Sequence, residues 1–370
     1  MKLKRIYANF VLLPASAIYG LVTWARNKLF DWNILRQHTF KVPVVVVGNL
    51  VAGGSGKTPH TEYLVEGLRH SHHLAVLSRG YKRQTKGFVT ATSHSTPRDI
   101  GDEPYQMYHK FNGQVRVVVC EDRVRGINEL LKIDPDIDLV ILDDAFQHRY
   151  VKPTVSVLIT EFAKPVYADR MLPYGRLRES ARGIYRADVV VVSKCPEAIK
   201  PVDCRILKNN LNLYPPPSQF LFFSRYNYCP LKPLFPAEVN AIPHLEWLDA
   251  EDSILILSGI GNPRPFVRQI KSYRAKVKIN VYPDHHNYTR KDLENIKRRF
   301  DSLRGRRRLI ITTEKDAVRL STNPYFPHEL KSVIYYLPIE VDFLKFTEKE
   351  TFIEAVRELL RQRKGLTNNQ

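Results

Sequence analysis

The chain has 370 residues, 44% of them hydrophobic, and 57 Lys and Arg against 38 Asp and Glu give it a formal net charge of +19. This length predicts two domains. The charge predicts an anionic partner, namely nucleic acid, an acidic membrane surface or a phosphorylated substrate, and leaves open a basic soluble protein with no such partner. No two of the four cysteines have CxxC spacing, which argues against a zinc site and against a disulfide framework.

The first expected element is a helix within residues 1–36, where a basic start precedes an apolar run from Ile6 to Val22. Trp24, Arg26 and Lys28 follow the run. A transmembrane helix needs roughly 20 apolar residues, and this run is shorter and is interrupted by polar residues and a proline. An apolar face with flanking bases and aromatics favours a helix lying on a membrane surface. A signal peptide and a helix packed on its own domain are the alternatives.

Apolar, β-branched runs then recur through residues 37–215, as expected for strands that are buried on both faces. Helical patterns lie between several of them, for example at Thr58–Arg69 and Asp122–Lys132. This alternation predicts an α/β fold with a doubly wound parallel sheet. The runs are Val44–Val47, Leu74–Leu77, Val115–Val119, Leu139–Leu142, Val155–Ile159 and Val189–Val192.

The proline-rich stretch Tyr214–Ser218 ends this pattern. The aromatic run after it predicts extended linker strands at 216–235, and a strand and glycine turn near Ser253 open a second, smaller α/β domain at 236–345. Residues 346–370 predict a final amphipathic helix and a tail.

A glycine-rich loop follows the first strand and leads into a helix. It ends in Gly-Lys-Thr like a Walker A motif, although Val51 stands where the strict pattern has its first glycine. Backbone amides of such a loop surround phosphate oxygens, the lysine reaches the β- and γ-phosphates, and the threonine hydroxyl ligates Mg²⁺. A turn without a ligand is the alternative. The expected phosphate-binding residues are Val51, Ala52, Gly53, Gly54, Ser55, Gly56, Lys57 and Thr58.

Two adjacent carboxylates, Asp143 and Asp144, end the apolar run at Leu139–Leu142. Carboxylates at the carboxyl end of a parallel strand lie beside the phosphate loop, so one of the pair is expected to hold Mg²⁺ directly or through water. The residue types do not decide which of the two is the direct ligand, and a helix cap is the alternative. Gln147 and His148 follow on the same turn and are candidates for contacts with nucleotide or substrate.

A phosphotransferase also needs a base or positioning carboxylate near the acceptor hydroxyl. The segment "IGDEPYQM" offers Asp102 and Glu103 at a glycine turn before a helix. Taken alone, two acids in this position more often cap a helix than act on a substrate.

The order of several unusual segments resembles the tetraacyldisaccharide 4'-kinase (lipid A 4'-kinase) family over roughly Phe10 to Leu320. These segments are "GNLVAGGSGKTP", "LSRGYKR", "GDEPYQM", "CEDRVRGI", "ILDDAFQHR", "LPYGRLRE", "ADVVVVSK", "GIGNPRPF", "PDHHNYT" and "TEKDAVRL". The missing Walker glycine is usual in that family. The resemblance implies a P-loop-containing NTPase-like fold, ATP and Mg²⁺ as cofactors, and transfer of the γ-phosphate to the 4'-hydroxyl of a tetraacyldisaccharide 1-phosphate. It also implies work at the cytoplasmic face of the bacterial inner membrane.

Residue by residue, the resemblance implies that Asp102 is catalytic and that His285 is its partner, with His286 as the alternative. An aspartate held by a histidine can accept or orient the hydroxyl proton. Because these residues fall in different domains, we expect the pair to form when the domains close.

The remaining candidates come partly from the motifs above and partly from the resemblance. Lys57 and Asp144 complete the catalytic set, and Thr58, Glu103, Asp143 and Asp144 are the candidate metal ligands. The candidates for contact with phosphate or sugar are Arg123, Arg178 and Glu179. Two loops after strands, Ser193–Cys195 and Thr313–Asp316, are candidates for contacting the base or closing the site, or are simple turns.

A lipid substrate gives the charge and the apolar N-terminus one explanation, since basic residues attract anionic lipid. The cluster Arg304–Arg308 is either a second basic contact or a solvated helix end. No nucleic-acid motif is present, so neither nucleic acid nor an obligate protein partner is expected. A P-loop GTPase or metallochaperone and a soluble small-molecule kinase are the alternative functions.

Overall fold

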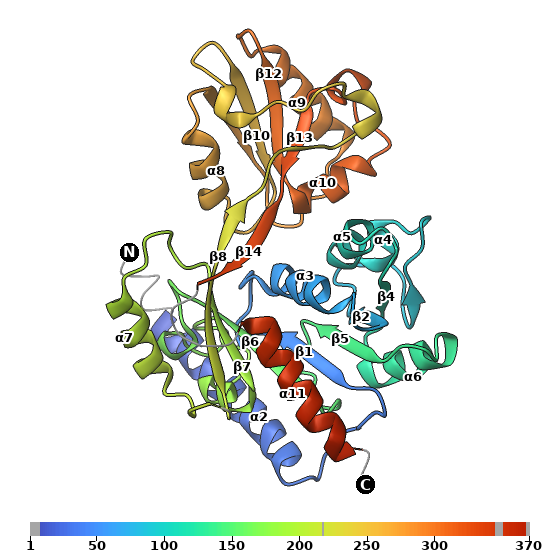
Figure 1. The fold of residues 1–370 in the computed structure, drawn as a ribbon. Coiled ribbons are helices and arrows are strands. Elements are labelled where there is room, and N and C mark those ends of the chain that lie inside the picture. The colour runs from blue at the N-terminus through green and yellow to red at the C-terminus, as the bar shows by residue number, and fades with distance from the viewer. Residues whose placement is uncertain (1–7, 217, 345–350, 368–370) are drawn as a thin grey trace.

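A computed structural model describes residues 8–216, 218–344 and 351–367. Nine strands of the described chain form one large sheet and five form a smaller one, and the two sheets lie in separate lobes (Figure 1). All six predicted strands are confirmed to within two residues. The strands of the large sheet, in spatial order, are β14 (Ile339–Phe343), β8 (Phe220–Tyr228), β7 (Val189–Ser193), β6 (Val155–Glu161), β1 (Val44–Gly48), β5 (Leu139–Asp143), β2 (Leu74–Ser78), β4 (Arg116–Val119) and β3 (Val89–Thr90).

The large sheet is parallel from β8 to β4, and only its two edge strands, β14 and β3, run antiparallel. Its central strands are buried along their whole length because helices cover both faces. The helices packed on one face are α3 (Lys57–Leu68), α5 (Asp102–Lys110) and α11 (Phe352–Thr367), and those on the other are α6 (Arg123–Ile133) and α7 (Pro201–Leu211). The short α4 (Pro97–Ile100) precedes α5. The predicted doubly wound architecture is therefore correct.

The chain crosses from one side of β1 to the other between β5 and β6. Such a change of direction leaves a crevice at the carboxyl ends of the neighbouring strands, where ligands of open α/β sheets bind. The glycine-rich loop follows β1, and Asp143 closes β5 directly beside it. The sheet thus brings the two predicted parts of the phosphate site to the same edge.

The smaller lobe has its own sheet and its own core. Its spatial strand order is β11 (Lys276–Val281), β10 (Ser253–Ser258), β12 (Arg308–Thr313), β13 (Ile334–Leu337) and β9 (Lys232–Pro233). Helices α9 (Arg290–Asp301) and α10 (Glu314–Ser321) pack on one face, and α8 (Arg264–Lys271) packs on the other.

The expected linker and the expected end of the smaller domain differ from the structure. Strand β8 lies within the predicted linker 216–235, but it pairs with β7 and belongs to the large sheet. Strand β14, predicted within 236–345, pairs antiparallel with β8 in the same sheet. Two strands therefore run side by side from the large lobe to the smaller one (Figure 1). Helix α11 packs on the large sheet. Within the predicted segment 346–370, residues 346–350 and 368–370 lie outside the described residues.

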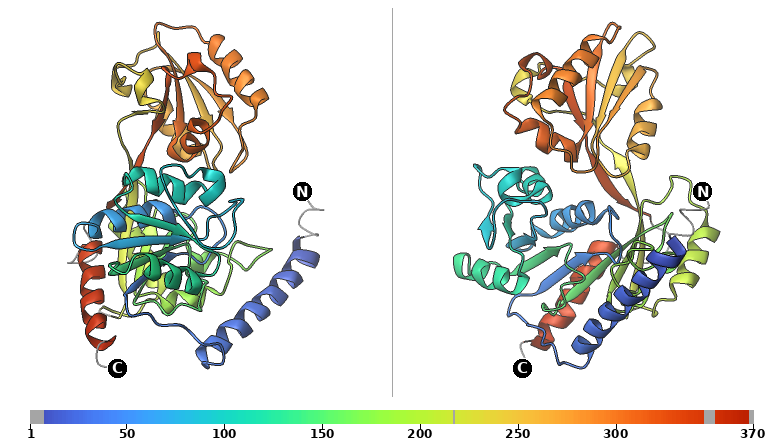
Figure 2. Two further views of the ribbon diagram at one scale, coloured as in Figure 1. Left: turned by 90° about the vertical axis from the view of Figure 1, so that its right-hand side faces the viewer. Right: turned by 180° about the vertical axis from the view of Figure 1, so that it is seen from behind.

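The N-terminal helix is present as α2 (Leu13–Asp31), preceded by a π-helical turn at Ala8–Leu12, and it runs along the outside of the large lobe (Figure 2). One side of the helix is docked, since Ser16 Oγ donates to the carbonyl of Met171 and Tyr19 Oη donates to the carbonyl of Arg178. The opposite side carries exposed apolar residues, with Ile18 66% exposed. Within the described residues, no helix has the length and apolar character needed to cross a membrane. The basic start at 1–7 lies outside the described residues.

Candidate active site

The glycine-rich loop turns sharply into α3. Gly56 is the residue before the helix, and its φ of +91° is a conformation that side-chain-bearing residues rarely adopt. A Cβ atom there would also lie 1.8 Å from Tyr226 Oη, so both the backbone and the neighbouring ring require glycine. Lys57 and Thr58 open the first turn of α3, where free backbone amides and the helix dipole favour an anion. The predicted strand, loop and helix are thus present in the required order.

Side chains from neighbouring strand ends hold the loop. Asn49 Nδ2 donates to Ser55 Oγ at 2.6 Å, and Ser193 Oγ donates to the Ser55 carbonyl at 2.8 Å. Lys194 Nζ donates to the carbonyl of Gly54. The segment Ser193–Cys195, for which the sequence left several roles open, therefore lies against the phosphate loop and fixes two of its carbonyls.

The two carboxylates at the end of β5 have different surroundings. Asp143 is buried, and its Oδ1 accepts a hydrogen bond of 2.8 Å from Thr61 Oγ1 of α3. Burial and then the adjacent charge of Asp144 raise the pKa of Asp143 to about 7. Asp144 is more exposed, and its Oδ1 lies 3.5 Å from Lys57 Nζ and 3.4 Å from Arg178 Nη1. A negative site, partly balanced by cations, therefore lies beside the loop.

Asp102 is the first residue of α5 and follows Gly101, whose φ is +91°. A Cβ atom on Gly101 would approach the backbone of Gly80 to 3.1 Å, so this turn also requires glycine. Across the interface, His285 lies after β11, and its Nδ1 is 3.0 Å from Asp102 Oδ2. The Tyr81 ring meets the His285 ring edge to face at 5.4 Å. The two residues that the resemblance paired, 183 positions apart, are therefore in contact.

His286 contacts a different group. Its Nε2 lies 3.0 Å from Asp292 Oδ2, within the smaller lobe. Of the two histidines in "PDHH", the structure brings His285 to Asp102 and leaves His286 in a local pair.

Helix α10 adds two cations that the sequence analysis did not connect with Asp102. Arg319 donates from Nε to Asp102 Oδ1 at 3.1 Å and from Nη2 to Oδ2. Lys315 Nζ lies 3.0 Å from Glu103 Oε1 and 3.0 Å from His285 Nε2. Burial alone would raise the pKa of Asp102, but the hydrogen bonds from His285 and Arg319 outweigh it and hold the pKa at about 2.

The spacing of Lys315 and Arg319 was a usable signal. Residues four apart on a helix lie on the same face, so both cations of "TEKDAVRL" had to point in one direction. What the sequence could not give was the acidic α5 start that they face, because that contact joins residues 217 positions apart.

The other candidate residues named from the sequence form hydrogen bonds or ion pairs within the protein. Arg123 is buried and donates to the carbonyls of Cys120 and Glu121. Gln147 Nε2 donates to the Asn49 carbonyl behind the loop. The carboxylate of Glu179 is occupied by Asn27 of α2 at 2.8 Å and by Arg186 at 2.9 Å. His148 lies in the turn after Asp144, and burial is the main cause that lowers its pKa to about 4.

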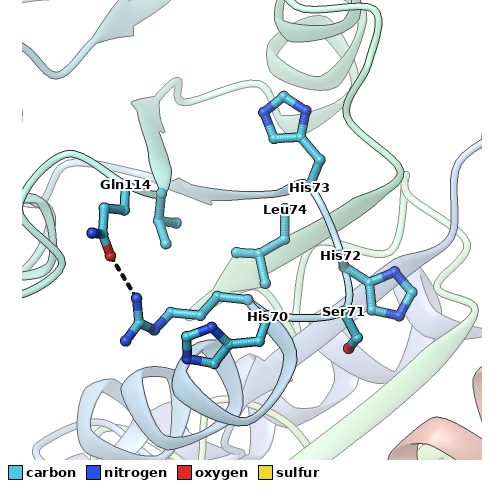
Figure 3. Close-up of a pocket in the computed structure, with 8 residues that line it drawn as sticks. His70, Ser71, His72, His73, Leu74 and Gln114 are labelled. Carbon is cyan, nitrogen blue, oxygen red and sulfur yellow. Dashed lines mark hydrogen bonds between the residues drawn. The ribbon is translucent and has the colours of Figure 1, made fainter.

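A separate cavity of about 400 Å³ lies at the amino ends of β2 and β4, on the edge of the sheet opposite to the phosphate loop (Figure 3). A hydrogen bond from Arg69 to Gln114 crosses it, and His70, His72 and His73 line it. Since ligands of this sheet type bind at the carboxyl ends of the strands, this cavity is not the candidate site.

The sequence model of the tetraacyldisaccharide-1-P 4'-kinase family, LpxK, matches residues 8–361. The chain belongs to this family. It is 50% identical over 342 residues to a tetraacyldisaccharide 4'-kinase of Bacteroides thetaiotaomicron, covering 90% of this chain and 89% of that one. It is 44% identical over 365 residues to a tetraacyldisaccharide 4'-kinase of Phocaeicola vulgatus, covering 98% of each chain.

A solved structure of LpxK from Aquifex aeolicus, in complex with ATP, matches the fold with a TM-score of 0.70 and 27% sequence identity. The match covers 95% of this chain and 98% of that one. Family membership favours the kinase interpretation over the GTPase, metallochaperone and soluble-kinase alternatives.

Proposed function

We propose that this chain transfers the γ-phosphate of ATP to the 4'-hydroxyl of a tetraacyldisaccharide 1-phosphate. The observation that carries the proposal is the contact between Asp102 and His285 across the two lobes, 3.0 Å between Nδ1 and Oδ2, in a member of this family. The turn before α5 also packs against the backbone of Gly80, which follows β2, and β2 pairs with β5. The start of α5 and the loop carboxylates therefore lie at the same edge of the sheet.

The phosphate loop supplies the nucleotide half of this site. Residues Val51 to Thr58 would surround the triphosphate with backbone amides, and the N-terminus of α3 adds positive potential. Lys57 would move from Asp144 to the β- and γ-phosphates, since its 3.5 Å contact with that carboxylate is long for an ion pair.

The donor set fits Mg²⁺. The Thr58 hydroxyl and the carboxylates of Asp143 and Asp144 are hard oxygen ligands, and Mg²⁺ is usually held by one or two carboxylates together with substrate phosphates. A divalent cation would also offset the burial and the repulsion from Asp144 that raise the pKa of Asp143 to about 7. Bound Mg²⁺ would neutralise the charge that develops on the phosphates. Glu103 is paired with Lys315 and would join the metal only after leaving that partner.

Asp102 would receive the acceptor hydroxyl. Its carboxylate is fixed by His285 and Arg319, so it can orient the hydroxyl and accept its proton as the phosphoryl group transfers. Because His285 comes from the other lobe, the pair is complete only while the lobes are in contact. If the pair forms only when the lobes close, the enzyme would hydrolyse less ATP in the absence of an acceptor.

The exposed side of α2 suits a lipid surface. Its apolar residues are Leu13, Ile18, Leu21, Val22 and Trp24, and the preceding turn Ala8–Leu12 adds Phe10 and Val11; each is at least 45% exposed. Apolar residues at helical spacing with an interfacial tryptophan are typical of helices that lie on a membrane. Of the two bases expected to face lipid, Lys28 has a 41% exposed side chain and lies 3.7 Å from Asp31, whereas Arg26 donates to the carbonyl of Gln147. We infer that the protein works at the cytoplasmic face of the inner membrane, where ATP and the lipid acceptor meet.

The test is a transfer assay with γ-³²P-labelled ATP and tetraacyldisaccharide 1-phosphate in mixed micelles, read by thin-layer chromatography. We expect label in the lipid product and none when the 4'-hydroxyl is removed from the acceptor. Label released only as inorganic phosphate, or label accepted equally by the 4'-deoxy lipid, would contradict the proposed reaction.

A further inference from the structure

Arg319 is a buried cation that reaches out of its own lobe. The residue is 8% exposed, and its guanidinium covers the Asp102 carboxylate side-on, with Nε on Oδ1 at 3.1 Å and Nη2 on Oδ2. A two-point contact of this kind fixes the plane of a carboxylate as well as its position. The orientation of Asp102 is therefore set by a side chain from α10.

The contacts leave Asp102 with few free acceptor positions. A carboxylate oxygen has two lone pairs. Oδ2 receives Arg319 Nη2 and His285 Nδ1, and so both of its lone pairs are used. Oδ1 receives only Arg319 Nε. Among the described contacts, the one acceptor position left on Asp102 is on Oδ1.

Lys315 determines which nitrogen of His285 carries the proton. An ammonium group can only donate, so Nε2, 3.0 Å from Lys315 Nζ, must act as the acceptor. A neutral imidazole then carries its proton on Nδ1, which faces Asp102 Oδ2 at 3.0 Å. The 2.8 Å approach of Arg319 Nη2 to Nδ1 follows from both groups converging on Oδ2.

Helix α10 is anchored within its own lobe by Asp316. Asp316 accepts hydrogen bonds from the backbone amide of Gly259 at 2.9 Å, from Thr313 Oγ1 at 2.7 Å and from Tyr288 Oη at 3.2 Å. These contacts fix the first turn of α10, and Lys315 and Arg319 project from the helix toward α5. The helix can therefore hold the two cations in a defined direction.

We propose that Arg319 is a positioning residue for the transfer, and that α10, through Arg319 and Lys315, orients Asp102 so that only Oδ1 is open to the acceptor hydroxyl. This inference rests on the proposed role of Asp102. Lysine cannot replace arginine in this role, because one ammonium group cannot bind both carboxylate oxygens in a fixed plane.

The first experiment measures kcat, the KM for ATP and the KM for the lipid in Arg319→Lys, which keeps the charge and removes the fork. A misplaced reacting group costs about 100-fold in rate, so we expect kcat to fall by about that factor while both KM values change little. The matched control is Arg307→Lys. Arg307 makes the same side-on contact with a buried carboxylate, at 3.1 and 2.7 Å from Asp252, within the same lobe but away from α5.

A double-mutant cycle with Asp102→Asn tests whether Arg319 acts through Asp102. We expect Arg319→Lys to cost little more in the Asp102→Asn background, because the carboxylate that it orients has already been altered. Fully additive losses would contradict the inference.

Guanidinium rescue keeps the inference testable if a variant is less stable. Added guanidinium hydrochloride should restore part of kcat in Arg319→Ala in a saturable way, and should restore none in Arg307→Ala. Thermal unfolding of all variants is followed in parallel. Loss of melting temperature in Arg319→Lys with kcat per folded molecule unchanged would show a structural role alone and would overturn the inference.

The cycle also separates this inference from the proposed site. If Asp102→Asn itself leaves kcat unchanged, the proposed role of Asp102 fails, and the positioning inference fails with it. If Asp102→Asn is inactive while Arg319→Lys is as active as the wild type, only the positioning inference fails.

Discussion

The two halves of the candidate site are built in different ways. The phosphate half is local, since Lys57 and Thr58 open α3 after β1, and Asp143 and Asp144 lie at the end of β5, the neighbour of β1 in one sheet. The acceptor half is assembled across the lobes, with Asp102 on α5 and His285 and Arg319 from the smaller lobe. The first half therefore depends on contacts within the large lobe, whereas the second depends on contacts between the lobes.

This difference separates binding from transfer. ATP binding should depend on the large lobe, and phosphoryl transfer should depend on both lobes. Changes in the phosphate half should affect the nucleotide and the rate together, while changes in the acceptor half should lower the rate and leave nucleotide binding intact.

The largest effect is expected in the phosphate half. Lys57→Met removes the cation that would contact the β- and γ-phosphates, and the loss of such electrostatic stabilisation costs about 10³-fold in kcat. The KM for ATP should rise as well, because the same lysine contacts the bound triphosphate. Steady-state kinetics with labelled ATP checks this, and an unchanged KM with reduced kcat would place Lys57 in the transition state alone.

A matched pair of histidine variants tests the acceptor half. His285→Ala removes the group that contacts Asp102, and we expect kcat to fall about 10- to 100-fold as the carboxylate loses its orientation. His286→Ala changes the neighbouring residue, which pairs with Asp292 and stacks on Tyr282, and should keep kcat within about twofold. The reverse ranking would move the role to His286.

The exposed side of α2 separates chemistry from substrate delivery. Leu21→Glu replaces a 62% exposed leucine, and the loss of roughly 1.5–3 kcal/mol of apolar burial should weaken binding to anionic vesicles at least about tenfold. Transfer to lipid in saturating micelles should stay near wild type. The control is Ile133→Glu on α6, 58% exposed and remote from α2 (Figure 1). Equal vesicle binding by all three proteins would exclude α2 from membrane contact.

The smallest expected effect is on the stability of the protein at acid pH, and it arises from His148 in the turn after Asp144. Burial, and next the charge of Arg123, lower the pKa of His148 to about 4, below the value of about 6.5 of an unfolded chain. Between these values the unfolded state binds more protons, so stability falls as pH drops from about 6.5 to 4. Because His148 is partly exposed, we discount the stability lost through its protonation to about 1 kcal/mol. The melting temperature lost between pH 7 and pH 5 should therefore be about 2 °C smaller in His148→Gln. Thermal scans at both pH values measure this.

The elements of the phosphate half could be predicted from the sequence because they are patterns of consecutive residues, whereas the binding of phosphate and Mg²⁺ by them stays a prediction. A buried strand, a glycine loop and a helix start are local patterns, and Asp143 and Asp144 end a strand that had to lie in the same sheet. The pair of Asp102 and His285 came from resemblance to a family, since nothing in the spacing of two distant residues shows that they meet.

What sequence could not give was pairing over long distances. The aromatic segment Phe220–Tyr228 was predicted to form linker strands, and it is a strand. Its pairing with β7 and β14 depends on the folded sheet, so its place in the large sheet could not be predicted. In the same way, Lys315 and Arg319 could be placed on one face of a helix, but the acids opposite them depend on how the two lobes come together.

The most direct measurement compares Asp102→Asn with the wild type in two assays, ATP affinity by calorimetry and single-turnover transfer of ³²P to the lipid acceptor. We predict a dissociation constant for ATP within about twofold of the wild type and a transfer rate lowered by at least about 100-fold, the scale of lost acid–base or positioning catalysis. A transfer rate within about threefold of the wild type, with the variant folded, would contradict a transfer site completed by the smaller lobe.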